Sequence, residues 1–289
     1  MTSTKITTQM ISELRARTGA GIGDCKAALE EAAGDTDTAA EVLRKKGIAK
    51  ADKRAGRMAA QGLVVIEASS DGRNAGMIEL NCETDFVAKT ADFIALANDL
   101  AKHVATKAPI GVKAGAVEDQ AFRGKTVAEA VKEISGKTGE AMVLSRYARF
   151  EQPDGVVAWY LHHNGQVGVL VDVEGKPGAE LTAFAKEVAL HIASANPLGV
   201  SEADIPAEVI QRERRIAEEQ VAAEGKPENI RSKIVDGKLR KFVAESTLLG
   251  QPFVKDDKQT VGDLAKAAAK SVGSPVVVKR FARFKIGEA

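Results

Sequence analysis

Residues 126–150 read TVAEAVKEISGKTGEAMVLSRYARF, and they align without a gap onto residues 260–284, which read TVGDLAKAAAKSVGSPVVVKRFARF. Nine of the 25 aligned positions are identical, and this similarity indicates an internal repeat. In both segments a helical pattern is followed by an apolar run that ends in alternating arginine and aromatic residues. The sequence therefore predicts the same helix-then-strand unit twice in one chain.

Two matched hairpins precede these units. Residues 63–80 and 156–173 each consist of two apolar runs around a turn dipeptide, Asp71-Gly72 in the first and Asn164-Gly165 in the second. Such dipeptides between apolar runs are strong hairpin signals. A helical pattern follows each hairpin, so each copy runs hairpin, helix, connection, helix, strand. This order predicts an α+β fold in which each copy has a three-stranded antiparallel sheet with helices on one face.

The second copy is longer than the first between its two helices. The offset between equivalent positions grows from 88 at His103/His191 to 134 at Thr126/Thr260, so the second copy carries some 46 additional residues. These residues fall within 206–245, which reads as two charged helical stripes with a turn at Gly225-Lys226-Pro227. A segment of this length is too long to be a simple loop in a compact domain. We therefore expect a helical hairpin that projects from the second copy.

The first 55 residues lie outside the repeat and carry three short apolar stripes of helical period. Breaks at Thr18–Gly21 and Gly34-Asp35 separate the stripes, which predicts a compact three-helix bundle. The predicted domains are therefore, in chain order, the bundle at 1–55, a first core subdomain at 56–151, a second core subdomain at 152–205 and 246–289, and the hairpin insertion at 206–245.

Composition excludes several classes of protein. The chain has 289 residues, and its formal net charge of +1 gives no electrostatic argument for binding nucleic acid or an anionic membrane. No apolar run approaches the ~20 residues of a membrane span, and the first residues do not resemble a signal peptide. The two cysteines, Cys25 and Cys82, are far apart and lack the spacing of a zinc site or a disulfide framework. We therefore expect a cytoplasmic protein in a reducing environment.

Catalytic chemistry has no support in the sequence. Gly19–Gly23 is rich in glycine but follows a helix and lacks the spacing of a phosphate-binding loop, so we interpret it as a turn between helices. Cys25 has no histidine nearby in the sequence, and His162-His163 has no acidic partner in the same motif. We expect no enzyme activity, no cofactor and no metal site of its own.

The arginine–aromatic alternation at 146–150 and 280–284 allows two interpretations. It could form a base-stacking surface for RNA, or it could belong to half-buried strands. Because the net charge is close to zero, we favour the strands. An RNA- or ribosome-associated module stays as the alternative, and a steep loss of affinity with salt would distinguish it.

Residues 82–89, CETDFVAK, place an acidic residue and a large aromatic residue between a strand and a helix. Phe86 could close the core at this corner together with Phe93, or it could point outward. The second copy has EGKPGAE at residues 174–180 in the same place, without an aromatic residue. Thr90 reads as the N-cap of a new helix, which separates Phe86 from the stripe that contains Phe93. We therefore predict that Phe86 is exposed.

Three stretches together resemble the bacterial elongation factor Ts family: ELRARTGAGIGDCKAALEEAAGD at 13–35, NCETDFVAK at 81–89 and LLGQPFV at 248–254. The resemblance covers essentially the whole chain. It implies a UBA-like N-terminal domain, two related core subdomains and a helical-hairpin insertion. It also implies a guanine-nucleotide exchange factor that binds elongation factor Tu, GDP-bound and nucleotide-free, as a heterodimer or in a larger complex. It implies no direct contact with nucleic acid or a membrane.

The resemblance also implies which residues contact the partner. Thr84, Asp85, Phe86 and Val87 match the family element that disturbs the magnesium and phosphate region of Tu, and Phe86 matches its wedging aromatic residue. His163 matches a histidine that contacts another domain of Tu, and Arg15 and Ile22 match further contacts. Two departures stand out, since some members have two methionines where this chain has Ile22-Gly23, and an isoleucine where it has Thr138.

Overall fold

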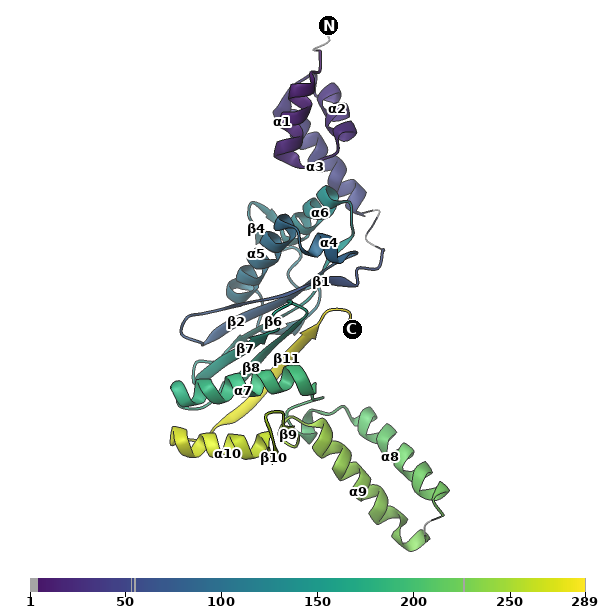
Figure 1. Ribbon diagram of the computed structural model, residues 1–289, viewed down its shortest axis with the longest axis vertical. Coiled ribbons are helices and arrows are strands. Elements are labelled where there is room, and N and C mark those ends of the chain that lie inside the picture. Colours follow the sequence, from purple (N-terminus) through teal and green to yellow (C-terminus); the bar gives the residue numbers. More distant parts are fainter. Residues whose placement is uncertain (1–4, 53, 55, 226, 289) are drawn as a thin grey trace. The chain divides into compact units, whose positions relative to one another are not determined.

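The computed structural model describes residues 5–52, 54, 56–225 and 227–288 (Figure 1). The chain forms two compact units. The first comprises the residues up to 65, residues 78–147 and the residues from 285 onward; the second comprises residues 66–77 and 148–284. The predicted α+β class is confirmed, together with the N-terminal helices, the repeated order of elements and the helical-hairpin insertion.

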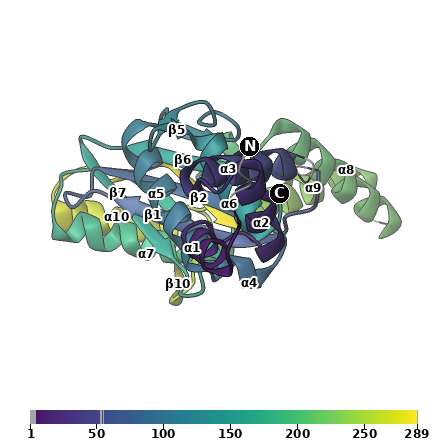
Figure 2. The same ribbon diagram turned by 90° about the horizontal axis from the view of Figure 1, so that it is seen from above.

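The N-terminal bundle consists of α1 (Thr8–Thr18), α2 (Ile22–Glu31) and α3 (Thr36–Asp52), which form one cluster in Figures 1 and 2. Its core is made of small and medium side chains: Leu14, Cys25, Ala28, Leu29 and Ala39 are all buried. Gly19 ends α1 at a φ of 69°, a left-handed conformation that favours glycine. Gly19–Gly21 therefore forms the turn between helices that the sequence predicted, whereas Ile22 and Gly23 already belong to α2.

Helix α3 extends beyond the bundle and packs against α6 (Val127–Thr138). The two helices approach most closely at two glycines, because a Cβ atom at Gly136 would lie only 2.8 Å from backbone atoms of Gly47. An ion pair between Lys132 Nζ and Asp52 Oδ1, 2.8 Å long, lies on the same contact. The bundle is thus joined to the first copy of the repeat by a close helix crossing.

The first copy of the repeat begins with a hairpin and ends with a strand. Its elements are β1 (Gln61–Ala68), β2 (Asn74–Cys82), α4 (Asp85–Ala88), α5 (Ala91–Lys107), β3 (Gly111–Lys113), β4 (Ala121–Phe122), β5 (Lys125–Thr126), α6 and β6 (Met142–Glu151). The sheet order is β1-β2-β6-β3. Ile78, Leu80, Phe93, Leu100 and Val131 are among the buried residues that pack the helices against the strands.

The second copy repeats this order. Its elements are β7 (Gly155–Leu161), β8 (Val167–Glu174), α7 (Ala179–Ala195), a short 3-10 turn (Glu202–Asp204), α8 (Ala207–Ala223), α9 (Glu228–Ser246), β9 (Pro252–Phe253), β10 (Asp256–Thr260), α10 (Val261–Val272) and β11 (Val277–Lys285). The sheet order is β11-β8-β7, three strands as predicted. The first sheet has a short fourth strand, β3, because the connection after α5 lies beside β6. In the second copy that connection carries the hairpin.

The arginine–aromatic strands have a structural role. Tyr147, Phe150 and Phe284 are buried, so their rings are not available for stacking on bases. Arg146 Nε donates to Glu79 Oε2 at 2.7 Å, and Arg280 Nε donates to Asp172 Oδ2 at 2.9 Å. Each arginine therefore pairs with a buried carboxylate on the neighbouring strand, and the interpretation as half-buried strands is confirmed.

A histidine–glutamine pair also occurs once in each copy. His103 Nε2 lies 2.8 Å from Gln120 Oε1, and His191 Nε2 lies 2.9 Å from Gln251 Oε1. A phenylalanine ring lies against each imidazole, Phe122 in the first copy and Phe253 in the second. These histidines are structural side chains of the two cores.

We expect the stability of the second unit to fall when the pH is lowered through about 6.5. Burial lowers the pKa of His191, so the folded chain binds fewer protons than the unfolded chain in this range. The stabilising contribution is therefore complete above the unfolded pKa and is lost as the pH decreases toward the folded one. Urea unfolding at pH 7.5 and 5.5 measures the difference. His191→Leu should reduce it, and an unchanged pH dependence in that variant would contradict the assignment.

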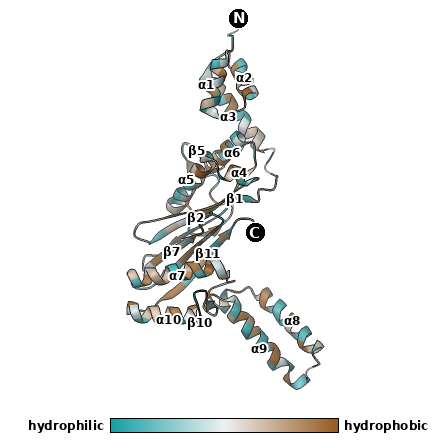
Figure 3. Cartoon of the chain, viewed as in Figure 1, coloured by the Kyte–Doolittle hydropathy of each residue, from teal (hydrophilic) through white to brown (hydrophobic). Residues whose placement is uncertain are grey.

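The insertion is a hairpin of α8 and α9 with a small core of its own. Ala217, Val221, Val235 and Leu239 are buried between the two helices. Figure 3 shows hydrophilic residues recurring along both helices. At the base, Leu198 N donates to Ser246 O at 2.8 Å, so the chain leaves and re-enters the second unit at neighbouring points. Lys226 of the predicted turn lies outside the described residues.

Replacing residues 206–245 by a short Gly/Ser linker should leave both cores folded. The hairpin buries its apolar residues against itself, and the segments at its base are already held side by side by backbone hydrogen bonds. A change in loop length costs only ~0.6 kcal/mol per doubling. Urea unfolding of the shortened chain should remain cooperative, with a similar midpoint. Loss of a cooperative transition would show that the hairpin is part of the core.

Within the described ranges, no helix combines the length and the apolar character that a membrane span requires.

Candidate partner-binding site

The segment from Cys82 to Thr90 turns the chain from β2 into α5 through the single-turn helix α4. Thr84 is the N-cap of α4, and its Oγ1 accepts a hydrogen bond from Val87 N at 3.4 Å. Thr90 is the N-cap of α5 and accepts from Phe93 N in the same way. The two caps divide the corner into two separate helices, as the sequence predicted for Thr90.

Phe86 projects from α4 into solvent, with 79% of its surface exposed. The residues that follow face inward, since Val87 is partly buried against the first core and Ala88 is buried. Phe93 is completely buried in that core. The prediction that Phe86 is exposed is confirmed, and the alternative in which both rings share one core face is wrong.

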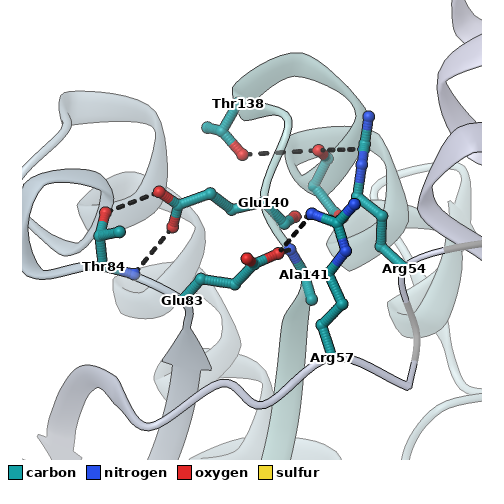
Figure 4. Close-up of polar contacts among 8 residues, drawn as sticks. Arg54, Arg57, Glu83, Thr84, Thr138, Glu140 and Ala141 are labelled. Carbon is teal, nitrogen blue, oxygen red and sulfur yellow. Dashed lines mark hydrogen bonds and ion pairs between the residues drawn. The ribbon is translucent and has the colours of Figure 1, made fainter.

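Two glutamates tie this corner to the loop between α6 and β6 (Figure 4). Glu140 Oε2 accepts from Thr84 N at 3.0 Å, and Glu140 Oε1 accepts from Thr84 Oγ1 at 2.6 Å. In return, Glu83 Oε1 accepts from Ala141 N at 2.7 Å. Arg57 Nη1 donates to the same oxygen of Glu83 at 3.4 Å. Residues 83–84 and residues 140–141 are therefore joined by hydrogen bonds in which each segment provides both a donor and an accepting carboxylate.

The thiol of Cys82 is part of the same structure. Burial raises the pKa of Cys82 to about 11, with a smaller contribution from the charge of Glu140, so the thiol is neutral near pH 7. Its Sγ donates to the carbonyl oxygen of Thr84 at 3.1 Å. Cys82 and Cys25 are both buried and free, so Cys82 serves as a structural residue and not as a nucleophile.

An ion pair lies beside the exposed ring. Lys89 Nζ is 2.6 Å from Asp85 Oδ2, and both side chains are more than half exposed. The hydrogen bond from Lys89 lowers the pKa of Asp85, which is therefore ionised at neutral pH. An exposed pair of this kind contributes little to stability. The surface at α4 thus presents an aromatic ring next to an exposed ion pair.

The other predicted contact residues lie elsewhere. Arg15 is exposed on α1, and Ile22, the first residue of α2, has 58% of its surface exposed; both belong to the first unit.

His163 is exposed in the turn between β7 and β8 of the second unit. Its ring lies 4.3 Å from that of His162, whose Nδ1 is 2.9 Å from Tyr160 Oη. Thr84, Asp85, Phe86 and Val87, which are consecutive in the sequence, form the cap and the first three residues of α4.

The exposed contact surface of the corner comes from Asp85, Phe86 and Lys89. In the part of the chain that the structure describes, no three His, Cys, Asp or Glu side chains gather in an arrangement that could hold a metal ion. Sequence reasoning did not find Glu140, because it lies 56 positions from Thr84. The alignment of Glu140 with Ser274 in the second copy was the signal that could have found it.

Comparison with known proteins shows similarity along the whole chain. The sequence model of a family described as "Elongation factor TS" matches residues 83–288. The elongation factor Ts of Methylococcus capsulatus is 45% identical over 283 residues, which covers 98% of this chain and 92% of the relative. That of Alkalilimnicola ehrlichii is 44% identical over the same coverage, and that of Aquifex aeolicus is 44% identical with 96% of each chain covered.

Proposed function

The chain belongs to the elongation factor Ts family, a family of translation elongation factors, and we propose that it is the guanine-nucleotide exchange factor of elongation factor Tu. It binds Tu that carries GDP, promotes release of the GDP and leaves Tu free to bind GTP. The observation that carries this proposal is the exposed ring of Phe86 on a firmly held turn, within the T-D-F-V element of the family.

The physical requirement for such a factor is a difference in affinity. It must bind nucleotide-free Tu more tightly than nucleotide-bound Tu. By linkage, the factor then lowers the affinity of Tu for the nucleotide by the same ratio. Phe86 and its neighbours enter Tu near the magnesium and phosphate site. Burial of an exposed phenylalanine contributes about 1.5–3 kcal/mol. Asp85 disfavours a phosphate group at the same place once its exposed ion pair with Lys89 opens on binding.

The other site residues have separate roles in this proposal. Thr84 caps α4, and Val87 anchors it to the core of this chain. His163 makes a second contact, with another domain of Tu, and Arg15 and Ile22 provide a third on the N-terminal bundle. In this proposal the factor acts in the cytoplasm as a heterodimer with Tu or in a larger complex. Its functional parts are the bundle at 1–55, the subdomains at 56–151 and at 152–205 with 246–289, and the insertion at 206–245.

The proposal is tested by the release of a fluorescent GDP analogue from purified Tu. Adding the chain should accelerate release strongly and in proportion to its concentration. Isothermal titration of the chain alone with GDP or GTP should give no binding, since the factor has no nucleotide site of its own. Unchanged release from Tu would contradict the proposal, and tight binding of nucleotide by the isolated chain would point to a different function.

Ile22→Ser is expected to weaken the complex with Tu about fivefold. The side chain is a little more than half exposed, and burying such a surface contributes about 1 kcal/mol. Titration of labelled Tu measures the dissociation constant. Ile110→Ser is the matched control, because Ile110 is similarly exposed but lies in the connection after α5. An equal loss of affinity in both variants would remove the specific role of Ile22.

A further inference from the structure

The duplicated scaffold provides an internal comparison for the corner that carries Phe86. In the aligned segments, Glu140 of the first copy corresponds to Ser274 of the second. Among the described residues, Ser274 Oγ accepts one hydrogen bond, from Lys176 N at 3.2 Å. Glu140 instead accepts two, from the backbone nitrogen and the hydroxyl of Thr84. In the second copy a serine is enough to link the strand-to-helix corner to the loop before the last strand. The two hydrogen bonds of Glu140 are therefore more than this link needs.

The second copy also lacks the feature that the carboxylate supports. There, β8 leads through Gly175 and Pro177 directly into α7, which begins at Ala179 without a side-chain cap. That corner has no equivalent of α4 and no aromatic residue. The carboxylate, the additional helical turn and the exposed phenylalanine therefore occur together, and all three are absent together from the second copy.

The hydrogen bonds explain this association. Thr84 Oγ1 has one hydrogen, which it donates to Glu140 Oε1, and this fixes the oxygen so that it can accept from Val87 N. Bonds to a carboxylate are stronger than those between neutral groups. Helix α4 has only four residues, and a single helical turn is unstable without support from outside. Glu140 therefore supports, from outside the helix, the turn from which Phe86 projects.

We propose that Glu140 is a positioning residue for nucleotide exchange: it holds α4 in the conformation that presents Phe86 to the partner. This inference rests on the proposed function. A wedge that is already ordered loses little conformational freedom when it binds, whereas a mobile one must be ordered at that moment. Glu140 touches neither nucleotide nor magnesium in this scheme and acts only through Thr84 and α4.

The test compares Glu140→Ser, which installs the residue of the second copy, with Glu140→Gln, which keeps the shape but has only one accepting oxygen. Both should slow catalysed GDP release, Glu140→Ser by about tenfold. Ser274→Ala is the matched control and should release GDP at the wild-type rate. Hydrogen exchange of the free variants should show faster exchange at residues 84–88, while the core helix α5 stays protected.

A double-mutant cycle distinguishes positioning from a general loss of structure. In a Phe86→Ala background, Glu140→Ser should cause little further loss of exchange activity, because Phe86, the side chain of α4 with the larger effect, is already gone. A further tenfold loss in that background would overturn the inference, and so would wild-type release rates in Glu140→Ser and Glu140→Gln. If the wild-type chain fails to accelerate GDP release, the proposed function fails instead. In that case, comparing the hydrogen-exchange protection of residues 84–88 in the free wild-type and Glu140→Ser proteins still shows whether Glu140 holds α4.

Discussion

Phe86→Ala is expected to slow the factor-dependent release of GDP from Tu by more than tenfold and to leave the free energy of unfolding nearly unchanged. The ring is 79% exposed in the free chain, so its removal leaves no cavity in the core. In the proposed complex the ring is buried, and losing ~2 kcal/mol of that burial in the exchange transition state reduces the rate by more than a factor of ten. Stopped-flow release and urea unfolding on the same preparation measure the two quantities.

Asp85→Ala is the neighbouring comparison for this variant. The carboxylate can repel a phosphate but fills no pocket, so its loss should slow release less than the loss of the ring does.

The Phe86→Ala preparation can also contradict the expected role of Phe86. A large decrease in stability combined with wild-type release rates would mean that Phe86 supports the fold and is not a wedge.

Phe93→Ala should show the opposite pattern, with a loss of about 3–5 kcal/mol in the free energy of unfolding. Phe93 lies three residues into α5 and is completely buried among residues such as Leu80, Leu96 and Leu100. Truncation removes the burial of the ring and leaves a cavity that the packed neighbours fill only in part. Urea unfolding measures the loss. The fraction that remains folded should still accelerate GDP release, because Phe86 and its cap remain in place.

Phe86→Ala and Phe93→Ala serve as controls for each other, because the same substitution is made at two sites seven positions apart, one exposed and one buried. Similar losses of stability in both variants would indicate that the corner and the core unfold as one unit. Loss of exchange activity in Phe93→Ala under conditions where it is fully folded would indicate that α5 takes part in the contact with Tu.

Much of this fold could be predicted from the sequence because its signals are local. The turns at Asp71-Gly72 and Asn164-Gly165, and the cap at Thr90, each depend on a few adjacent residues. The exposure of Phe86 followed from comparing the two copies, since the second copy closes the same corner without an aromatic residue.

Other features depend on contacts that no local pattern reveals. Strand β3 has only three residues, too few for a detectable alternation, and it forms because the connection after α5 lies beside β6. Glu140 meets Thr84 only once the chain has folded, since the two are far apart in sequence. The surface residues Arg15, Ile22 and His163 came from family resemblance, because exposure alone does not indicate what a side chain binds.

The crossing of α3 and α6 places unequal limits on natural sequence variation. A Cβ atom at Gly136 would lie 2.8 Å from the backbone of Gly47, whereas a Cβ atom at Gly47 would lie 3.7 Å from Gly136, an ordinary contact distance. The two glycines touch, yet alanine fits at one and not at the other. During divergence α3 can therefore accept a small side chain while α6 cannot. A lineage that loses the glycine of α6 must move the backbones of α3 and α6 apart at this crossing.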